Sequence, residues 1–110
     1  MGKKGNDLSK SARLELILLI LETYGKGDGV TTGEIFLLCN QSFPGMSKRT
    51  LFRDLNELST RVPVSDQIVD GKRRWILSLD SQAKERLTHL KAKYQEEILG
   101  LLRKVAGEPV

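Results

Sequence analysis

The sequence predicts a mainly α-helical protein with one small β-hairpin and a long C-terminal helix. Three observations support this fold class. A residue suited to a helix N-cap followed by leucines at helical spacing indicates a short helix over 47–58. Asp70-Gly71 between two apolar runs indicates a hairpin over 64–79. From residue 80 to residue 106, apolar side chains recur every three or four positions, which is typical of a helix. At 110 residues, the chain is long enough for one domain and too short for two.

The composition suits a globular protein with a modest core, with 39% hydrophobic and 29% charged residues. Eighteen Lys and Arg residues against fourteen Asp and Glu residues give a net charge of +4, which permits nucleic-acid binding but is weak evidence for it. One Cys and one His cannot form a disulfide framework or a structural zinc site, so we expect no metal or other cofactor, and no small-molecule ligand is evident. With no apolar run long enough to span a membrane and no secretory signal, we expect a cytoplasmic protein that does not bind membranes.

Three segments are expected along the chain. Residues 1–8 read as a flexible basic tail, residues 9–79 as one compact domain and residues 80–110 as a C-terminal dimerisation helix. The first helix should begin near Ser9 and is apolar around its whole circumference at 16–21. Such a helix must be covered on more than one face, so we expect a second copy to supply part of the cover. The residues assigned to that contact are Leu18 and Leu21.

A second helix is predicted from the capping box Thr31-Thr32-Gly33-Glu34, in which Thr31 caps the helix and Glu34 reaches back. It should run to about Asn40 and place Cys39 in the core as a small hydrophobe. Residues 41–46 then form the turn to the next helix.

The third helix carries the sequence features that point to function. Ser47 is a good N-cap, and an apolar stripe follows at Leu51, Leu55 and Leu58. At about 100° per residue, the opposite face carries Arg49, Arg53 and Asn56. Arg offers a rigid fork for guanine edges and phosphates, and Asn can read adenine, so this face fits a DNA major groove. A merely solvated helix face is the alternative.

The hairpin prediction includes its register. Asp-Gly suits a type I′ turn, which pairs Val69 with Lys72, Ile68 with Arg73, and Gln67 with Arg74. The core face in this register carries Val64, Ile68, Trp75 and Leu77. The cations Lys72, Arg73 and Arg74 crowd the tip, where they would grip phosphates or the minor groove, or alternatively protect an edge strand from aggregation.

The last helix is predicted to be about 38 Å long, which is more than a small domain can cover. Its apolar residues follow an eleven-residue pattern, which keeps the stripe nearly straight. Part of this stripe should therefore meet a second copy, unless the helix folds back onto its own domain. The residues assigned to dimerisation here are Leu87, Leu90, Tyr94, Ile98, Leu101 and Val105.

The order of three helices, a basic hairpin and a long helix is that of a winged helix-turn-helix domain. Residues 47–58 resemble the S-x-R-T-[IL]-x-R-D-[IL]-x-x-L recognition-helix motif of DeoR-type and WYL-domain bacterial transcriptional regulators, and the likeness covers about residues 9–79. The resemblance implies that Arg49 and Arg53 contact bases or phosphates, and that Ser47 and Thr50 contact phosphate. The turn before this helix is longer than in DeoR-type proteins, and no WYL or sugar-binding domain is expected to follow.

The predicted function is a homodimeric transcriptional regulator, most simply a repressor, that binds an inverted-repeat operator in double-stranded DNA. Asp54, which flanks the leucine stripe, is expected to hold a neighbouring Arg or backbone group rather than DNA. The alternative is a protein-interaction adaptor that does not bind DNA. We expect no enzyme, because the sequence shows no catalytic triad, metal-ligand cluster or phosphate-binding loop. The residues assigned to DNA are Ser47, Lys48, Arg49, Thr50, Arg53, Asn56, Lys72, Arg73 and Arg74.

Overall fold

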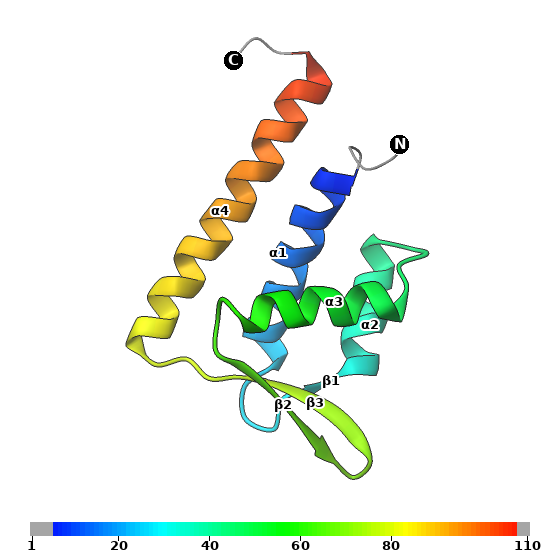
Figure 1. Ribbon diagram of the computed structural model, residues 1–110, viewed down its shortest axis with the longest axis vertical. Coiled ribbons are helices and arrows are strands. Elements are labelled where there is room, and N and C mark those ends of the chain that lie inside the picture. The colour runs from blue at the N-terminus through cyan, green and yellow to red at the C-terminus, as the bar shows by residue number, and fades with distance from the viewer. Residues whose placement is uncertain (1–5, 108–110) are drawn as a thin grey trace.

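The computed structural model describes residues 6–107 (Figure 1). Helix α1 lies at the centre, with the other three helices packed against it and a three-stranded antiparallel sheet of order β1-β3-β2 closing one end. None of these helices combines the length and apolar character needed to cross a membrane. In chain order the elements are α1 (Asn6–Tyr24), β1 (Val30–Thr31), α2 (Thr32–Ser42), α3 (Lys48–Ser59), β2 (Val64–Val69), β3 (Lys72–Leu77) and α4 (Ser81–Ala106).

The boundary of the expected N-terminal tail is wrong. Helix α1 begins at Asn6, so residues 6–8 belong to the helix, while residues 1–5 lie outside the described part of the chain. No Gly or Pro interrupts the chain between Asn6 and Ser9, so the helix extends further than its apolar pattern indicates.

The apolar run of α1 is covered by this chain alone. Leu18 and Leu21 are 0% exposed within a core built with α2, α3, α4 and β3, so their assignment to a dimer contact is wrong. Helix α1 is covered on several faces, as its apolar run predicts, but its own chain supplies that cover. Within the run, Leu19 alone is largely exposed.

Helix α4 folds back antiparallel to α1, as Figure 1 shows. Its residues Leu87, Leu90 and Tyr94 are buried in the core, which corrects their assignment to a dimer interface. Three polar contacts tie the two helices: Ser11 Oγ donates to Glu97 Oε1 at 2.9 Å, Gln95 Nε2 to Glu15 Oε2 at 2.8 Å, and Lys91 Nζ to Glu22 Oε1 at 2.9 Å. Beyond Tyr94 the stripe emerges, with Ile98 and Leu101 half-buried and Val105 exposed.

A buried ion pair fixes α3 against α1. Asp54 accepts from Arg13 Nε at 2.7 Å and from Arg13 Nη2 at 3.3 Å, and its side chain is only 3% exposed. The two-pronged geometry lets the guanidinium offset the cost of burying the carboxylate. The expectation that Asp54 holds a neighbouring Arg is thus confirmed, with Arg13 as its partner.

The hairpin has the predicted register, from Val69 opposite Lys72 to Gln67 opposite Arg74. Asp70 and Gly71 both have positive φ, 53° and 75°, as a type I′ turn requires. Ile68, however, is 70% exposed, which corrects its placement in the core. It shares the predicted face, but the hairpin extends beyond the helices that would cover that side chain.

Strand β1 was not predicted, because two residues are too few to show a pattern. Val30 pairs with Trp75 at the edge of the sheet, and the indole Nε1 of Trp75 donates to Thr32 Oγ1 at 2.8 Å. The chain approaches closely here at Gly29, which has φ 86° and where a Cβ would lie 2.6 Å from the Trp75 carbonyl oxygen.

The Arg13–Asp54 pair yields a stability prediction. Arg13→Met leaves the Asp54 carboxylate buried without a partner and should lower the free energy of unfolding by about 3–5 kcal/mol. Urea denaturation measures this loss. The double variant Arg13→Met/Asp54→Leu should recover much of it, because both charges are gone. Equal stability of wild type and Arg13→Met would contradict the role of the pair.

Cys39 yields a pH prediction, because burial raises the pKa of its thiol from 9.0 to about 11. Between these two pH values the unfolded chain releases a proton that the native thiol retains, so stability falls as pH rises. The loss should be on the order of 2–3 kcal/mol more in wild type than in Cys39→Ala when urea unfolding is compared across this range. Parallel pH profiles for the two proteins would refute the prediction.

Candidate nucleic-acid interface

The candidate site begins with the cap of α3. Ser47 has the extended backbone of an N-cap, and its Oγ accepts from the Thr50 backbone N at 3.1 Å. The Ser47 hydroxyl in turn donates to Thr50 Oγ1 at 3.1 Å. Both residues were assigned to phosphate, but in this structure they bond to each other and orient the start of the helix.

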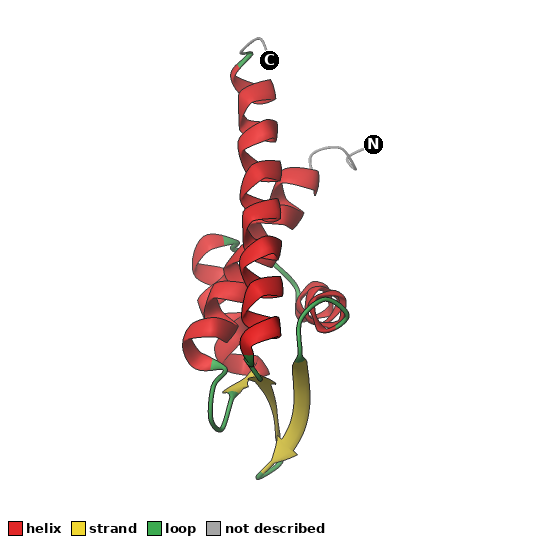
Figure 2. Cartoon of the chain, turned by 90° about the vertical axis from the view of Figure 1, so that its left-hand side faces the viewer, coloured by secondary structure: helices red, strands yellow, loops and turns green. Residues whose placement is uncertain are grey.

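The outer face of α3 carries the predicted reading residues Arg49, Arg53 and Asn56. All three are exposed, whereas the leucines of the opposite stripe are completely buried. Within residues 10–107, no carboxylate forms an ion pair with Arg49 or Arg53. Figure 2 shows α3 end-on, standing out from the layer that contains α4, with the hairpin running below it. The structure therefore presents two unneutralised guanidiniums on a projecting helix.

Of the hairpin cations, Arg73 lies on the side of α3. Its guanidinium carbon is 5.5 Å from the centre of the Phe52 ring, and its Nε is 3.5 Å from Asp66 Oδ2. Phe52 in turn packs against Trp75, with 6.4 Å between ring centres. This chain of contacts holds the hairpin against α3 and places a cation over Phe52, the neighbour of Arg53 in the sequence of α3.

Lys72 and Arg74 belong to the opposite face of the hairpin, because successive side chains of a strand alternate. Arg74 is half-buried and lines a hollow of about 500 Å³ with α2 residues that include Glu34. Hydrogen bonds from Thr31 lower the pKa of the Glu34 carboxyl, and the charges of Arg74 and Lys72 contribute to the same shift. The three consecutive cations therefore do not form one patch.

Lys48 lies at the flank of α3 that faces α2. Its Nζ is 5.6 Å from the centre of the Phe36 ring, and the side chain is exposed. We define the reader face as Lys48, Arg49, Arg53, Asn56 and Arg73. The structure thus brings together five of the nine residues assigned to DNA, while Ser47 and Thr50 orient the helix, and Lys72 and Arg74 lie on the other side of the hairpin.

Sequence reasoning missed the contacts of Arg73 with Phe52 and Asp66. The predicted register already indicated these contacts, because it places Arg73 on the face of the hairpin that carries Trp75. Lys72 and Arg74 lie on the opposite face. The chemistry of the reader face is that of an anion-binding surface. Within the described residues, no cluster of three His, Cys, Asp or Glu side chains could hold a metal ion.

Comparisons of this chain with protein-family models, with curated proteins and with solved structures found no match.

Proposed function

We propose that the protein is a homodimeric transcriptional regulator that reads double-stranded DNA with α3 and contacts the DNA backbone with the hairpin. The observation that carries this proposal is the reader face. It places the guanidiniums of Arg49 and Arg53 on the exposed side of a projecting helix, with no carboxylate bound to either within residues 10–107. A major groove about 12 Å wide admits such a helix, and Arg and Asn match the edges of guanine and adenine.

The hairpin contributes in two ways under this proposal. Arg73 lies beside the reading residues, so it binds phosphate along the edge of the groove that α3 occupies. Lys72 and Arg74 lie on the far face and contact the backbone beyond it, near the adjacent minor groove. Asp66 partly neutralises Arg73, which limits the contribution of that cation.

Dimerisation is proposed through the projecting end of α4. The 26 residues of α4 span about 39 Å and the 19 residues of α1 span about 28 Å, so the last turns of α4 outrun the helix that covers them. Leu99, Leu102 and Val105 are exposed there at 52%, 46% and 78%. A second copy that pairs with this end would bury these side chains. A two-fold axis through the pair would match an inverted-repeat operator in the cytoplasm, where occupancy of a promoter represses transcription.

A protein-interaction adaptor is the second candidate. It is favoured by Leu37 and Tyr24, which are 68% and 55% exposed beside the hollow that Arg74 lines. Salt distinguishes the two functions. A DNA-binding protein loses affinity for duplex steeply as salt rises, because its phosphate contacts release counterions, whereas an adaptor has no duplex affinity to lose.

Arg53→Ala tests the reader face. With a duplex selected by the wild-type protein from random sequences, the variant should bind about 5-fold to 150-fold more weakly, which corresponds to about 1–3 kcal/mol. Fluorescence anisotropy at fixed salt measures the change. Lys84→Gln is the matched control, because it removes one exposed cation from α4 outside the reader face. Unchanged affinity of Arg53→Ala would exclude α3 as the reading helix.

Leu99→Glu combined with Leu102→Glu tests the dimer. Both side chains are about half exposed in the single chain, so the charges should leave the helical circular-dichroism signal unchanged. Two carboxylates in an apolar contact should raise the dimer dissociation constant by at least about tenfold. Sedimentation velocity measures the change. A monomeric wild-type protein, or a variant as dimeric as wild type, would reject the proposed interface.

A further inference from the structure

A hollow lined by three helices lies away from the reader face. It is an open groove of about 650 Å³ between the start of α1, the end of α3 and the second half of α4. Its volume falls in the range of small-molecule sites, about 300–1,000 Å³. The lining residues that matter below are Lys10, Leu14, Arg61, Lys93, Tyr94 and Leu101.

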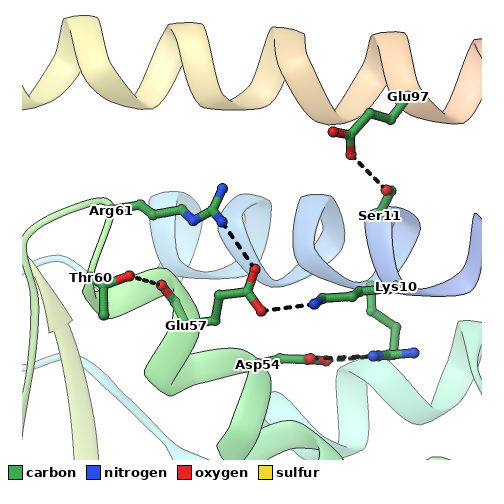
Figure 3. Close-up of polar contacts among 8 residues, drawn as sticks. Lys10, Ser11, Asp54, Glu57, Thr60, Arg61 and Glu97 are labelled. Carbon is green, nitrogen blue, oxygen red and sulfur yellow. Dashed lines mark hydrogen bonds and ion pairs between the residues drawn. The ribbon is translucent and has the colours of Figure 1, made fainter. Parts of the chain in front are cut away.

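The groove carries excess positive charge. Its lining holds five cations, with Arg103 and Lys104 among them, but only the carboxylates Glu57 and Glu97. Figure 3 shows that both carboxylates are already engaged. Glu57 lies 3.1 Å from Lys10 Nζ and 3.4 Å from Arg61 Nη2, and Glu97 accepts from Ser11.

Three cations of this lining remain without a carboxylate. Within residues 10–107, no ion pair engages Lys93, Arg103 or Lys104. These three side chains belong to the part of α4 that runs along the groove. An anion that enters the groove would therefore meet three cations that no carboxylate pairs directly within residues 10–107.

Tyr94 supplies the second, independent observation. The residue is 2% exposed, and its buried hydroxyl has no hydrogen bond of good geometry among the described residues, although the Arg61 side chain lies near enough to oppose the upward shift of its pKa. Buried polar groups almost always have a partner, so an unpartnered hydroxyl at a groove lining indicates a missing one. Burial raises the pKa of the Tyr94 phenol, so the hydroxyl is a donor at neutral pH.

We propose that this groove binds a small organic carboxylate with an apolar body. Lys93 and Arg61 hold the carboxylate, and the Tyr94 hydroxyl donates a hydrogen bond to it. Leu14 and Leu101 cover the apolar part of the ligand. Arg61 lies near the Tyr94 hydroxyl and is paired with Glu57, so its side chain turns from Glu57 to the ligand carboxylate and uncovers the hydroxyl when the ligand enters.

The position of Glu57 links this groove to α3. Glu57 lies on α3 one turn after Arg53, and its carboxylate joins the helix to Lys10 of α1 and to Arg61. A ligand carboxylate competes with Glu57 for Arg61 and so loosens the end of α3. Weaker DNA binding in the presence of ligand follows from this competition; that consequence rests on the proposed function, whereas binding to the groove does not.

The test uses 2-naphthoate and the 110-residue chain labelled with ¹⁵N. Amide chemical shifts recorded during a titration should saturate and should be largest at groove residues such as Ser11, Gly100 and Leu101. The neutral isostere 2-naphthamide should bind at least about tenfold more weakly, because it lacks the charge that the cations attract. Shifts that fail to saturate at millimolar naphthoate, or that centre on Leu99 and Leu102, would overturn the site.

Tyr94→Phe gives the sharpest variant, because it should weaken ligand binding without lowering the stability of the protein. Loss of the hydroxyl should weaken naphthoate binding by about fivefold or more. The same change removes an unpartnered buried group, so the thermal midpoint should stay the same or rise. A Tyr94→Phe protein that binds naphthoate as tightly as wild type would reject the assignment.

Two lysine variants separate a local site from general charge. Lys93→Gln should weaken naphthoate binding, and Lys84→Gln, which removes a cation of α4 outside the groove, should not. If Lys93→Gln lowers affinity for duplex DNA while wild type binds no naphthoate, the groove belongs to the DNA interface and the proposal falls. Naphthoate binding by a protein that binds no duplex would instead uphold the groove and reject the proposed function.

Discussion

The buried pair of Arg13 and Asp54 is the constraint on which the arrangement of this protein depends. A carboxylate that is almost fully covered must keep its partner, and the partner here belongs to α1, the central helix. Together with the leucine stripe of α3, the pair fixes how α3 is rotated about its own axis. The face that carries Arg49 and Arg53 must then point outward, because the opposite face is committed to the core.

Helix α1 also determines which part of α4 remains exposed to solvent. It packs along α4 as far as Glu97, and the last turns of α4 extend past the start of α1, so the same apolar stripe is buried at Tyr94 and exposed at Val105. We propose that the exposed Leu99 and Leu102 form the dimer contact and that the cationic groove binds the ligand. Both proposals follow because α4 is longer than α1, the helix that packs along it.

Local features could be predicted from the sequence, and distant ones could not. The Thr31 and Ser47 caps, the Asp70-Gly71 turn and its register depend on neighbouring residues, and the structure has them as predicted. The outward face of α3 follows equally from helical spacing. The cover of Leu18 and Leu21 depended on whether α4 folds back, which helical periodicity does not encode. The groove was missed because residues from three helices line it, and a lone tyrosine in an apolar stripe resembles any other core residue.

The most direct test of the account is an amide chemical-shift map of the ¹⁵N-labelled protein with a duplex selected by the protein itself. We expect shifts over α3 from Lys48 to Asn56 and in the hairpin at Arg73, with the exposed end of α4 little changed. Shifts confined to α4, or an unperturbed α3 in a protein that binds the duplex, would contradict it.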